Sequence, residues 1–334
     1  MMRRVLLPLR RWFGGYAVRP ARPAPPAALL HRISGATMGT RFQVTFAAAP
    51  MDLTDLGAAL FAAVDAVDRQ MSTYKPSSDL SRFNGAALDR WVPVPAAVAR
   101  VVTEGLRISS ASQGAFDMTL GGAVNAWGFG PDPAPVLPDQ AQPLGQYATL
   151  QVRCDPPALC KSAPFALDLS GIAKGFAVDE LVRVLESRAI TNYLAEIDGE
   201  VRARGRKPGL QGAWSVGLDA PVAGQRAVWD VLMPGDGALA TSGDYRHFVV
   251  TDGKLRAHSI DGRTGWPVDN DVASVTVRHA SCMTADAWAT ALLVLGQDQG
   301  PAVAEAQGIQ ALFLVRSGTG IAPITTCGFT ADGV

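Results

Sequence analysis

After residue 33 the hydrophobic pattern of this chain switches repeatedly between two periods. Alternation with a period of two, as in Arg41–Phe46, is typical of a strand with one buried face, and the spacing in Leu53–Met71 and Ala96–Ser112 is that of amphipathic helices. No repeat of fixed length accompanies the switching. The chain therefore has to fold around a core that helices and strands share.

Strands dominate the second half of the chain. Phe165–Leu169 predicts a short buried strand that turns at Ser170 and Gly171 into a helix over Ile172–Arg188. This mixture of helices and hairpin-forming strands favours an α+β fold with mixed or antiparallel sheets and packed helices. Further strands are expected at Tyr193–Ile197, Val201–Arg204, Ala213–Leu218, Ala227–Met233, Phe248–Val250, Val272–Val277 and Ala311–Val315, with a last helix over Thr284–Leu295 that Gly296 stops.

The 334 residues, 48% hydrophobic and 18% charged, are enough to bury a sizeable core. We expect a single elaborated domain over residues 34–334, preceded by a mobile leader over residues 1–33 that is rich in arginine and proline. No apolar run is long enough for a transmembrane span. The leader matches neither a clean export signal nor a lipoprotein cysteine, which leaves a cytoplasmic and a periplasmic or inner-membrane-associated location both open.

Charge and cysteine content exclude two classes of function. The 30 basic and 30 acidic side chains cancel, so the chain as a whole has no attraction for nucleic acid. The four cysteines include no C-x-x-C pair and no histidine at zinc-ligand spacing. Cys154 and Cys160 either close a small disulfide loop or remain two thiols.

The turn Asp168–Gly175 is the first of four segments that could carry chemistry. It places a carboxylate at the expected end of a strand and the N–H groups of a helix start where phosphate binds well. Lys174 adds a positive charge in the first helical turn, which the helix dipole disfavours and a bound anion would offset. The alternative is a solvated lysine beside a tight turn.

The start of the last helix offers two oxygen-bearing side chains on one face. Asp286 and Thr290 are four residues apart, so both point the same way. A hard cation such as Mg²⁺ prefers carboxylate, hydroxyl and carbonyl oxygens, and it keeps water and substrate phosphate as its other ligands. The alternative is that Asp286 stabilises the helix dipole while Thr290 packs.

A glycine-rich turn carries His258 and Asp261. A histidine that titrates near neutral pH can accept a proton from an attacking hydroxyl, and a nearby carboxylate can orient it. Hydrogen bonding within the turn is the alternative.

Aromatic residues and one acid lie in a fourth segment, Gly114–Thr119, and in the later Asn125–Gly130. Phe116 and Trp127 are candidates to stack on a planar ligand, or else to pack in the core.

Taken in order, these segments resemble the ApbE family, the FAD:protein FMN transferases, across roughly residues 34–296. Seven ordered places agree with the family pattern, which is more than chance explains. They are Thr37-Met38-Gly39-Thr40, Met71-Ser72-Thr73-Tyr74 with Ser81-Arg82-Phe83-Asn84, Gly114-Ala115-Phe116-Asp117, Asp168–Gly175, Ala240–Tyr245, His258–Gly265 and Met283–Thr290. Phe176 and Asp198 depart from the pattern, where tyrosine and glycine are usual.

The resemblance implies an ApbE-type fold that binds FAD as substrate and transfers FMN to a threonine or serine of a target flavoprotein, such as a subunit of a membrane respiratory complex, with release of AMP. It implies Mg²⁺ at Asp286, Thr290 and the backbone oxygen near Gly171, with His258 as the base, which Asp261 would orient. The FAD site would be lined by Met38, Tyr74, Ala115, Phe116, Asp117, Asp168, Lys174 and Ile260.

Two other functions remain open at this point. A pyrophosphatase would use the same site with water in place of the protein hydroxyl, giving FMN and AMP. A flavin-binding or assembly protein would hold FAD without turnover. The sequence identifies neither the acceptor protein nor the oligomeric state.

Overall fold

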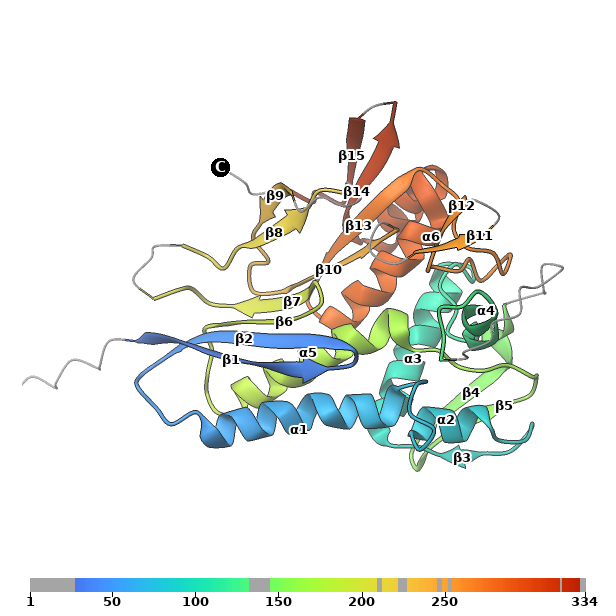
Figure 1. Cartoon of the computed structure of the whole chain (residues 1–334), viewed down its shortest axis with the longest axis horizontal. Coiled ribbons are helices and arrows are strands. Elements are labelled where there is room, and N and C mark those ends of the chain that lie inside the picture. The colour runs from blue at the N-terminus through green and yellow to red at the C-terminus, as the bar shows by residue number, and fades with distance from the viewer. Residues whose placement is uncertain are drawn as a thin grey trace, which may run out of the picture.

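One antiparallel sheet runs through the molecule (Figure 1). The computed structural model describes residues 28–131, 145–208, 212–221, 227–244, 248–251, 254–318 and 320–330. In this part of the chain the sheet has eight strands, and their numbers ascend from one edge to the other. In spatial order they are β1 (Leu29–Thr37), β2 (Thr40–Ala48), β6 (Tyr193–Ile197), β7 (Glu200–Arg204), β10 (Ala238–Gly243), β13 (Val272–His279), β14 (Gln310–Ser317) and β15 (Gly320–Thr326).

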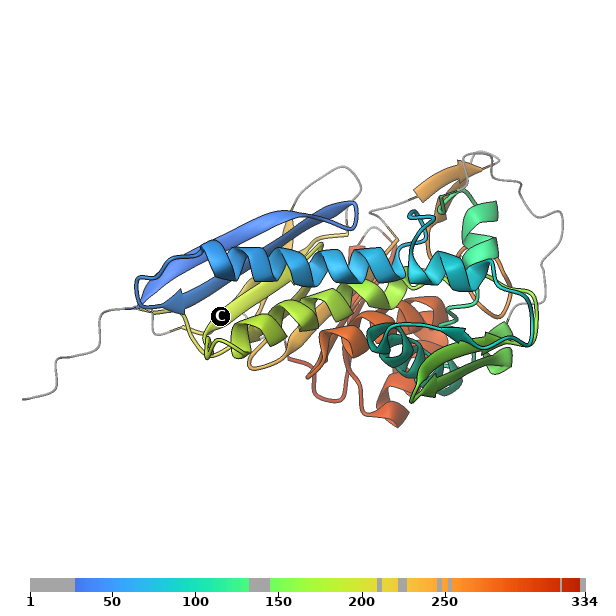
Figure 2. The ribbon, with the colours of Figure 1, turned by 90° about the horizontal axis from the view of Figure 1, so that it is seen from below.

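Helices α1 (Thr54–Met71), α5 (Ser170–Glu186) and α6 (Cys282–Gln307) cover one face of this sheet, and α3 (Ala96–Ala111) packs against α5 and α6. Figure 2 shows α1 and α5 side by side along the sheet. The alternating side chains Phe42, Val44 and Phe46 of β2 are fully buried against these helices, as are Leu60 of α1 and Trp288 of α6. The main core therefore lies between the sheet and the helical layer.

A hairpin covers part of the other face of the sheet. It consists of β8 (Val216–Asp219) and β9 (Val228–Leu232), which pair antiparallel. Leu218 and Leu232 of the hairpin pack with Val201 and Leu239 of the sheet in a second, smaller core. The sheet thus buries apolar side chains on both faces in this region.

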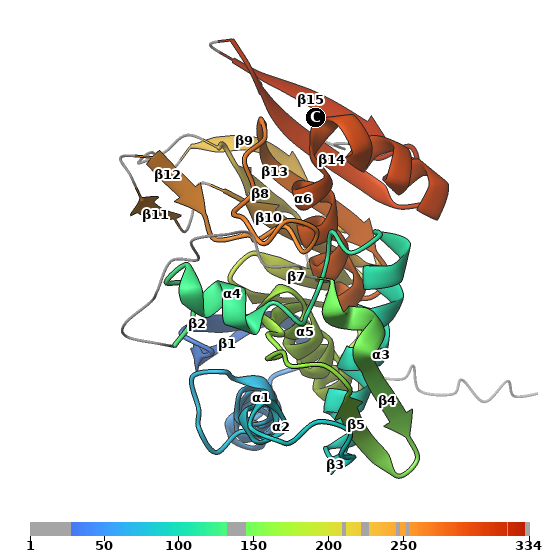
Figure 3. The ribbon, with the colours of Figure 1, turned by 90° about the vertical axis from the view of Figure 1, so that its right-hand side faces the viewer.

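Smaller elements gather at one end of the molecule (Figure 3). A three-stranded sheet has the order β3-β5-β4, and a hairpin pairs β11 with β12. The elements are α2 (Asp79–Asn84), β3 (Val92–Pro93), α4 (Gly121–Ala126), a 3-10 turn over Gln146–Thr149, β4 (Leu150–Cys154), β5 (Pro157–Lys161), β11 (Phe248–Thr251) and β12 (Lys254–Ala257).

Helix α6 is broken at Gly296, whose φ of 73° and ψ of −176° are not helical. The side chain of Asn270 donates to the carbonyl of Leu293 at 3.0 Å, so one of the carbonyls that the break frees has a partner. The predicted stop at Gly296 is confirmed, and the chain resumes a helical course up to Gln307.

The predicted α+β class is confirmed, and most predicted elements lie within a few residues of their observed bounds. The strand predicted at Phe165–Leu169 is wrong, since the segment forms only one isolated bridge, between Ala166 and Leu120. This segment is fixed instead by side chains, because the amide of Asn84 donates to the carbonyl of Leu167 and accepts its N–H, at 2.9 and 2.7 Å. No sheet partner is needed to hold it.

The expected leader over residues 1–33 extends too far. Leu29–Ile33 pair with Val44–Ala48 in the β1–β2 hairpin, while residues 1–27 lie outside the described residues. Polar side chains hide this strand in the sequence, because Arg32 lies on its exposed face and His31 stacks on Phe46 on the other.

All four cysteines are free thiols. The register of the β4–β5 hairpin pairs Cys154 with Pro157 and Cys160 with Gln151, so the two cysteines are not opposite each other. In the described part of the chain, no helix combines the length and the hydrophobicity that membrane spanning requires.

Candidate active site at the crossing of α5 and α6

Helices α5 and α6 cross so closely that the contact requires glycine. A Cβ atom on Gly175 would lie 2.3 Å from the carbonyl oxygen of Cys282 and 2.7 Å from Cβ of Asp286. One turn earlier on α5, a Cβ on Gly171 would lie 3.3 Å from Oγ1 of Thr290. Positions four apart on α5 therefore face positions four apart on α6, and the crossing brings together the three residues expected to bind metal.

Asp286 and Thr290 present oxygen atoms in this crossing. The Asp286 carboxylate is 3% exposed, and its Oδ2 accepts the backbone N–H of Gly175 at 2.9 Å. The Thr290 hydroxyl lies 3.1 Å from the hydroxyl of Ser242 on β10. A carboxylate oxygen, a hydroxyl and the nearby backbone of Gly171 are oxygen donors of the kind that Mg²⁺ prefers, so the residues fit a hard cation.

Lys174 lies among three acids at the crossing. The ammonium group of Lys174 lies 3.1 Å from Oδ2 of Asp198 and 3.2 Å from Oε1 of Glu200. Burial alone would lower the pKa of Lys174, but the carboxylates of Glu200, Asp286 and Asp198 raise it. Burial also raises the pKa of Glu200 and of Asp286, while Lys174 opposes that rise. Lys174 is thus a paired residue and not a solvated one.

Asp168 stabilises the turn into α5. Its Oδ1 accepts the backbone N–H of Ser170 at 2.7 Å and also the Ser170 hydroxyl. The backbone N–H of Asp168 donates to the carbonyl of Met118 at 2.8 Å, which ties this turn to the segment after Asp117. Asp168 therefore organises the start of α5.

Three predicted FAD-site residues, Ala115, Phe116 and Asp117, are buried beside this turn. The ring of Phe116 would be 3.3 Å from a Cβ on Gly171, so Phe116 packs against the start of α5. Oδ1 of Asp117 accepts the N–H and the hydroxyl of Thr119 at 2.8 and 2.6 Å, and burial raises the pKa of this carboxyl. The side chain of Phe116 is in the main core, as the core alternative predicts, and Ala115 lies in the same core.

The loop that carries His258 lies against the same segment. A Cβ on Gly262 would be 2.2 Å from the carbonyl oxygen of Gly114, so backbone meets backbone here. Ile260 is 6% exposed and packs with Leu120 and Trp127. Trp127 also donates from Nε1 to the carbonyl of Gly265 at 3.0 Å, so it holds the loop rather than offering a free stacking surface.

His258 and Tyr74 flank Phe129. The rings of His258 and Phe129 meet edge to face, with their centroids 6.3 Å apart. The hydroxyl of Tyr74 donates to the backbone carbonyl of Phe129 at 2.9 Å, and Tyr74 is 64% exposed. An exposed aromatic ring and a half-buried imidazole therefore border the same short segment.

Asp261 is bound by Arg263. Its Oδ1 accepts from Nε of Arg263 at 2.9 Å and its Oδ2 from Nη2 at 2.8 Å, and the backbone N–H of Arg263 also donates to Oδ1. Arg263 in turn donates to Oε1 of Gln299 on α6 at 2.9 Å. The described hydrogen bonds of Asp261 thus fix the shape of the loop, and orientation of His258 by Asp261 stays a prediction.

Met38 occupies the two-residue turn between β1 and β2, where its φ is 45°. It is half-buried against the main core. Figure 1 shows this turn at the end of the sheet where α5 begins. Within the described residues no hydrogen bond links Met38 to the other site residues.

Sequence reasoning missed Ser242 and Glu200 as parts of this site. Ser242 lies in the segment Ala240–Tyr245 that carried the resemblance, yet its small side chains predict no strand. Glu200 follows the turn at Asp198 and Gly199, and its burial depends on Lys174, which is remote in the sequence. In the described part of the chain, no group of three or more His, Cys, Asp or Glu side chains forms a further candidate metal site.

Comparison with known proteins decides the family. The model of the ApbE family matches residues 38–313. The chain belongs to the ApbE family. Its relatives in that family include the FAD:protein FMN transferase of Vibrio cholerae, which is 39% identical over 312 residues, or 91% of this chain and 92% of the relative. The FAD:protein FMN transferase of Haemophilus influenzae is 35% identical over 316 residues, or 89% and 90% of the two chains.

Solved ApbE structures have the same fold. The flavin transferase ApbE from Vibrio cholerae superposes with a TM-score of 0.80 at 37% identity, covering 90% of this chain and 98% of that one. The apo flavinyl transferase ApbE of Pseudomonas stutzeri gives a TM-score of 0.81 at 34% identity, covering 90% and 95%. The expected ApbE-type fold is confirmed.

Proposed function

We propose that this protein transfers FMN from FAD to a threonine or serine hydroxyl of a target flavoprotein, releases AMP, and requires Mg²⁺. The observation that carries the proposal is the crossing of α5 and α6, which brings Asp286, Thr290 and Gly171 together at a helix start suited to phosphate. The names of the ApbE relatives support the same activity.

The proposed reaction balances as one displacement at phosphorus. The acceptor oxygen forms a bond to the phosphorus of the FMN half of FAD, and the bond from that phosphorus to the bridging oxygen breaks. AMP leaves with the bridging oxygen, and the acceptor hydroxyl gives up its proton. Such a reaction needs charge neutralised on the phosphoryl oxygens and the hydroxyl deprotonated in line with the leaving group.

Asp286, Thr290 and the backbone oxygen of Gly171 would hold Mg²⁺, which supplies charge neutralisation for the pyrophosphate when bound. The start of α5 presents the positive end of its helix dipole to the phosphate oxygens, and Asp168, which accepts the N–H of Ser170, keeps that turn in shape. Lys174 stays protonated near neutral pH because its pKa is raised, so its charge offsets part of the negative charge of the three acids around it.

His258 is the base in this proposal. Its imidazole accepts the hydroxyl proton, and the edge-to-face contact with Phe129 limits how the ring can turn. The exposed ring of Tyr74 provides a surface for the flavin on the other side of Phe129. The pair of Asp261 and Arg263 holds the loop against α6.

The test is incubation of the purified protein with FAD and Mg²⁺, with and without an acceptor domain that carries a threonine. AMP release that depends on the acceptor, together with an acceptor mass gain equal to one FMN, is the expected result. AMP and free FMN without a mass gain would establish the pyrophosphatase instead. Bound FAD without AMP would establish a flavin-binding protein.

A further inference from the structure

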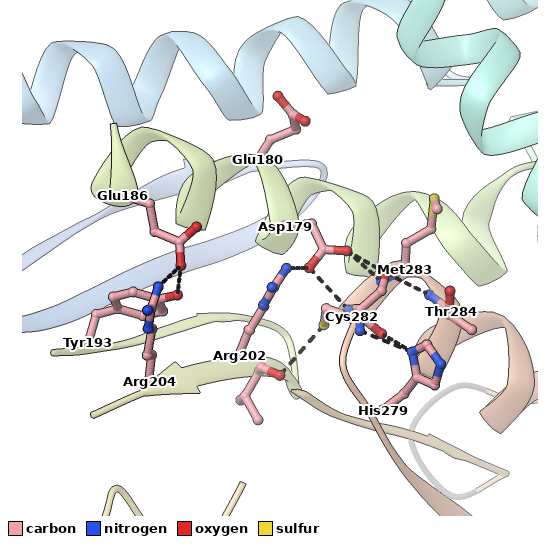
Figure 4. Close-up of polar contacts among 12 residues, drawn as sticks. Asp179, Glu180, Glu186, Tyr193, Arg202, Arg204, His279, Cys282, Met283 and Thr284 are labelled. Atoms are coloured by element: carbon pink, nitrogen blue, oxygen red, sulfur yellow. Dashed lines mark hydrogen bonds and ion pairs between the residues drawn. The ribbon is translucent and has the colours of Figure 1, made fainter. Parts of the chain in front are cut away.

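The carboxylate of Asp179, on α5, accepts hydrogen bonds from the N-terminus of α6 (Figure 4). Oδ1 of Asp179 accepts the backbone N–H of Cys282 at 3.1 Å, and its Oδ2 accepts the N–H of Met283 at 3.1 Å and the hydroxyl of Ser281 at 2.8 Å. Nη1 of Arg202, on β7, donates to Oδ1 at 2.6 Å. Asp179 thus receives donors from both a helix start and the central sheet.

These contacts lie along the same line of contact between α5 and α6 as the candidate cation site. Asp179 follows Gly175 and Gly171 at four-residue spacing on α5, and Cys282 precedes Asp286 and Thr290 at the same spacing on α6. Gly175 faces Cys282 and Asp286, and Gly171 faces Thr290. Eight residues of helix span about 12 Å, so the contacts of Asp179 lie only two turns from Thr290.

Two sets of hydrogen bonds fix the position of α6 along α5. At the crossing, the backbone N–H of Gly175 donates to Asp286 at 2.9 Å. The bonds to Asp179 hold α6 at its N-terminal end, where the thiol of Cys282 adds a contact to the carbonyl of Val201 at 3.6 Å. A rise of about 1.5 Å per residue means that a slip of one residue would separate Thr290 from Gly171.

Positive charges on two sides hold the Asp179 side chain in place. The side chain is 15% exposed and meets the guanidinium of Arg202 and the positive end of the α6 dipole. Burial would lower the pKa of Arg202, but Asp179 raises it, so the guanidinium stays charged. The side chains of Asp179 on α5 and Arg202 on β7 therefore hold the first turn of α6.

We propose that Asp179 is a positioning residue for the cation site, acting through the N-terminus of α6 to set the distance between Asp286, Thr290 and Gly171. The inference rests on the proposed function for the identity of that site. It assigns to Asp179 no contact with substrate or metal.

The test measures Mn²⁺ binding by electron paramagnetic resonance in the full chain, alongside the metal dependence of FMN transfer. Asp179→Asn keeps the size of the side chain but places an amide nitrogen among donors, so it breaks at least one of the bonds to α6 or Arg202. We expect Mn²⁺ to bind about tenfold more weakly, the loss typical of groups that support metal ligands. Transfer should recover at high Mg²⁺, because the ligands themselves are intact.

Glu180→Gln is the matched control. Glu180 is the next residue on α5, and its carboxylate pairs with Arg100 and Arg183 at 2.7 and 2.8 Å, away from α6. Figure 4 shows Glu180 pointing away from Asp179 and the α6 start. Glu186→Gln is a second control, because Glu186 bonds Tyr193 and Arg204 but nothing on α6. Both controls should bind Mn²⁺ as the wild type does.

Ser281→Ala provides a milder variant in case Asp179→Asn fails to fold. It removes one donor to Asp179 together with the side-chain cap on the N–H of Thr284, and it should weaken Mn²⁺ binding in the same direction by a smaller factor. Wild-type Mn²⁺ affinity in folded Asp179→Asn or in Ser281→Ala would overturn the positioning role. Failure of the wild type to form an FMN adduct while Asp179→Asn still weakens Mn²⁺ binding would overturn the proposed function and leave the positioning role standing.

Discussion

The backbone N–H of Gly175 donates to the carboxylate of Asp286 at 2.9 Å across a sequence separation of 111 residues. This bond is possible because α5 carries no side chain at the crossing point, so the two backbones come into contact. The bond fixes Oδ2 of Asp286 and thereby the orientation of the whole carboxylate group. The absence of a Cβ on one helix therefore decides where the carboxylate on the other helix lies.

Gly175→Ala should separate the two helices. The added Cβ would meet the backbone carbonyl of Cys282, which cannot turn aside, so the cost is that of overpacking, about 1–3 kcal/mol of unfolding free energy. Mn²⁺ binding should weaken as well, because Asp286 moves with α6. Denaturant unfolding and Mn²⁺ titration measure the two effects.

Gly57→Ala, in the interior of α1, is the control for this substitution. A Cβ there has no atom within 4 Å, so the change should stabilise the protein by about 0.4–1 kcal/mol. Equal effects at both positions would contradict the close crossing.

Thr290→Val should reduce FMN transfer at least about tenfold with little loss of stability. The substitution keeps the shape of the side chain and removes the hydroxyl next to Gly171 and Ser242. Thr276→Val is its match, because the buried hydroxyl of Thr276 meets that of Thr241 at 2.9 Å away from the crossing. Transfer rates of the two variants decide the matter, and similar losses in both would argue against a role for the Thr290 oxygen.

Arg263→Met should reduce transfer at least as much as Asp261→Asn, because it also removes the bond to Gln299, and the double variant should be no slower than Arg263→Met. Both changes break the same bidentate ion pair between Asp261 and Arg263, which holds the loop of His258, so their effects on the transfer rate should not add. His258→Asn should abolish transfer and retain FAD binding. A double-mutant cycle on the transfer rate measures the coupling, with Arg107→Met, which breaks the pair with Glu104, as the control.

A much larger loss of transfer rate in Asp261→Asn than in Arg263→Met, together with a shifted pH profile of that rate, would contradict this prediction. It would mean that Asp261 acts on the imidazole of His258 directly.

Asp117 and Asp52 should give opposite pH dependences of stability. Both bind a threonine two residues on through its N–H and hydroxyl, but Asp117 is buried, which raises its pKa above 3.8, whereas the bonds from Thr54 lower the pKa of exposed Asp52. The contribution of Asp117 is present below pH 3.8 and is lost as pH rises through its raised pKa. The contribution of Asp52 is present above pH 3.8 and is lost as pH falls through its lowered pKa.

Urea unfolding of Asp117→Asn, Asp52→Asn and the wild type between pH 3 and 7 tests this contrast. Asparagine keeps an oxygen for the threonine in each case. Relative to the wild type, the free energy of unfolding of Asp117→Asn should increase as pH rises, while that of Asp52→Asn should decrease. The same sign at both sites would show that burial does not control the pKa of Asp117.

Periodicity and motifs predicted what depends on neighbouring residues in the chain. The helix over Thr54–Met71 and the break at Gly296 follow from local spacing and backbone preference. Asp179 has no such signal, because an acid inside a helix is ordinary until a second helix brings its N–H groups to it. The pairing of Asp261 with Arg263 is equally hidden, since the sequence pattern indicates only His258 as the partner of Asp261.

The strands of the central sheet follow one another across it in chain order, from β1 at one edge to β15 at the other. A chain leaving the ribosome can therefore enlarge its sheet at a single growing edge, and no strand has to be inserted between two that are already paired. Each pause exposes the newest strand, which remains open to pairing with a second chain until the next one arrives. Because α6 follows β13, activity should appear only late in synthesis, when all but the last two strands of the sheet are in place.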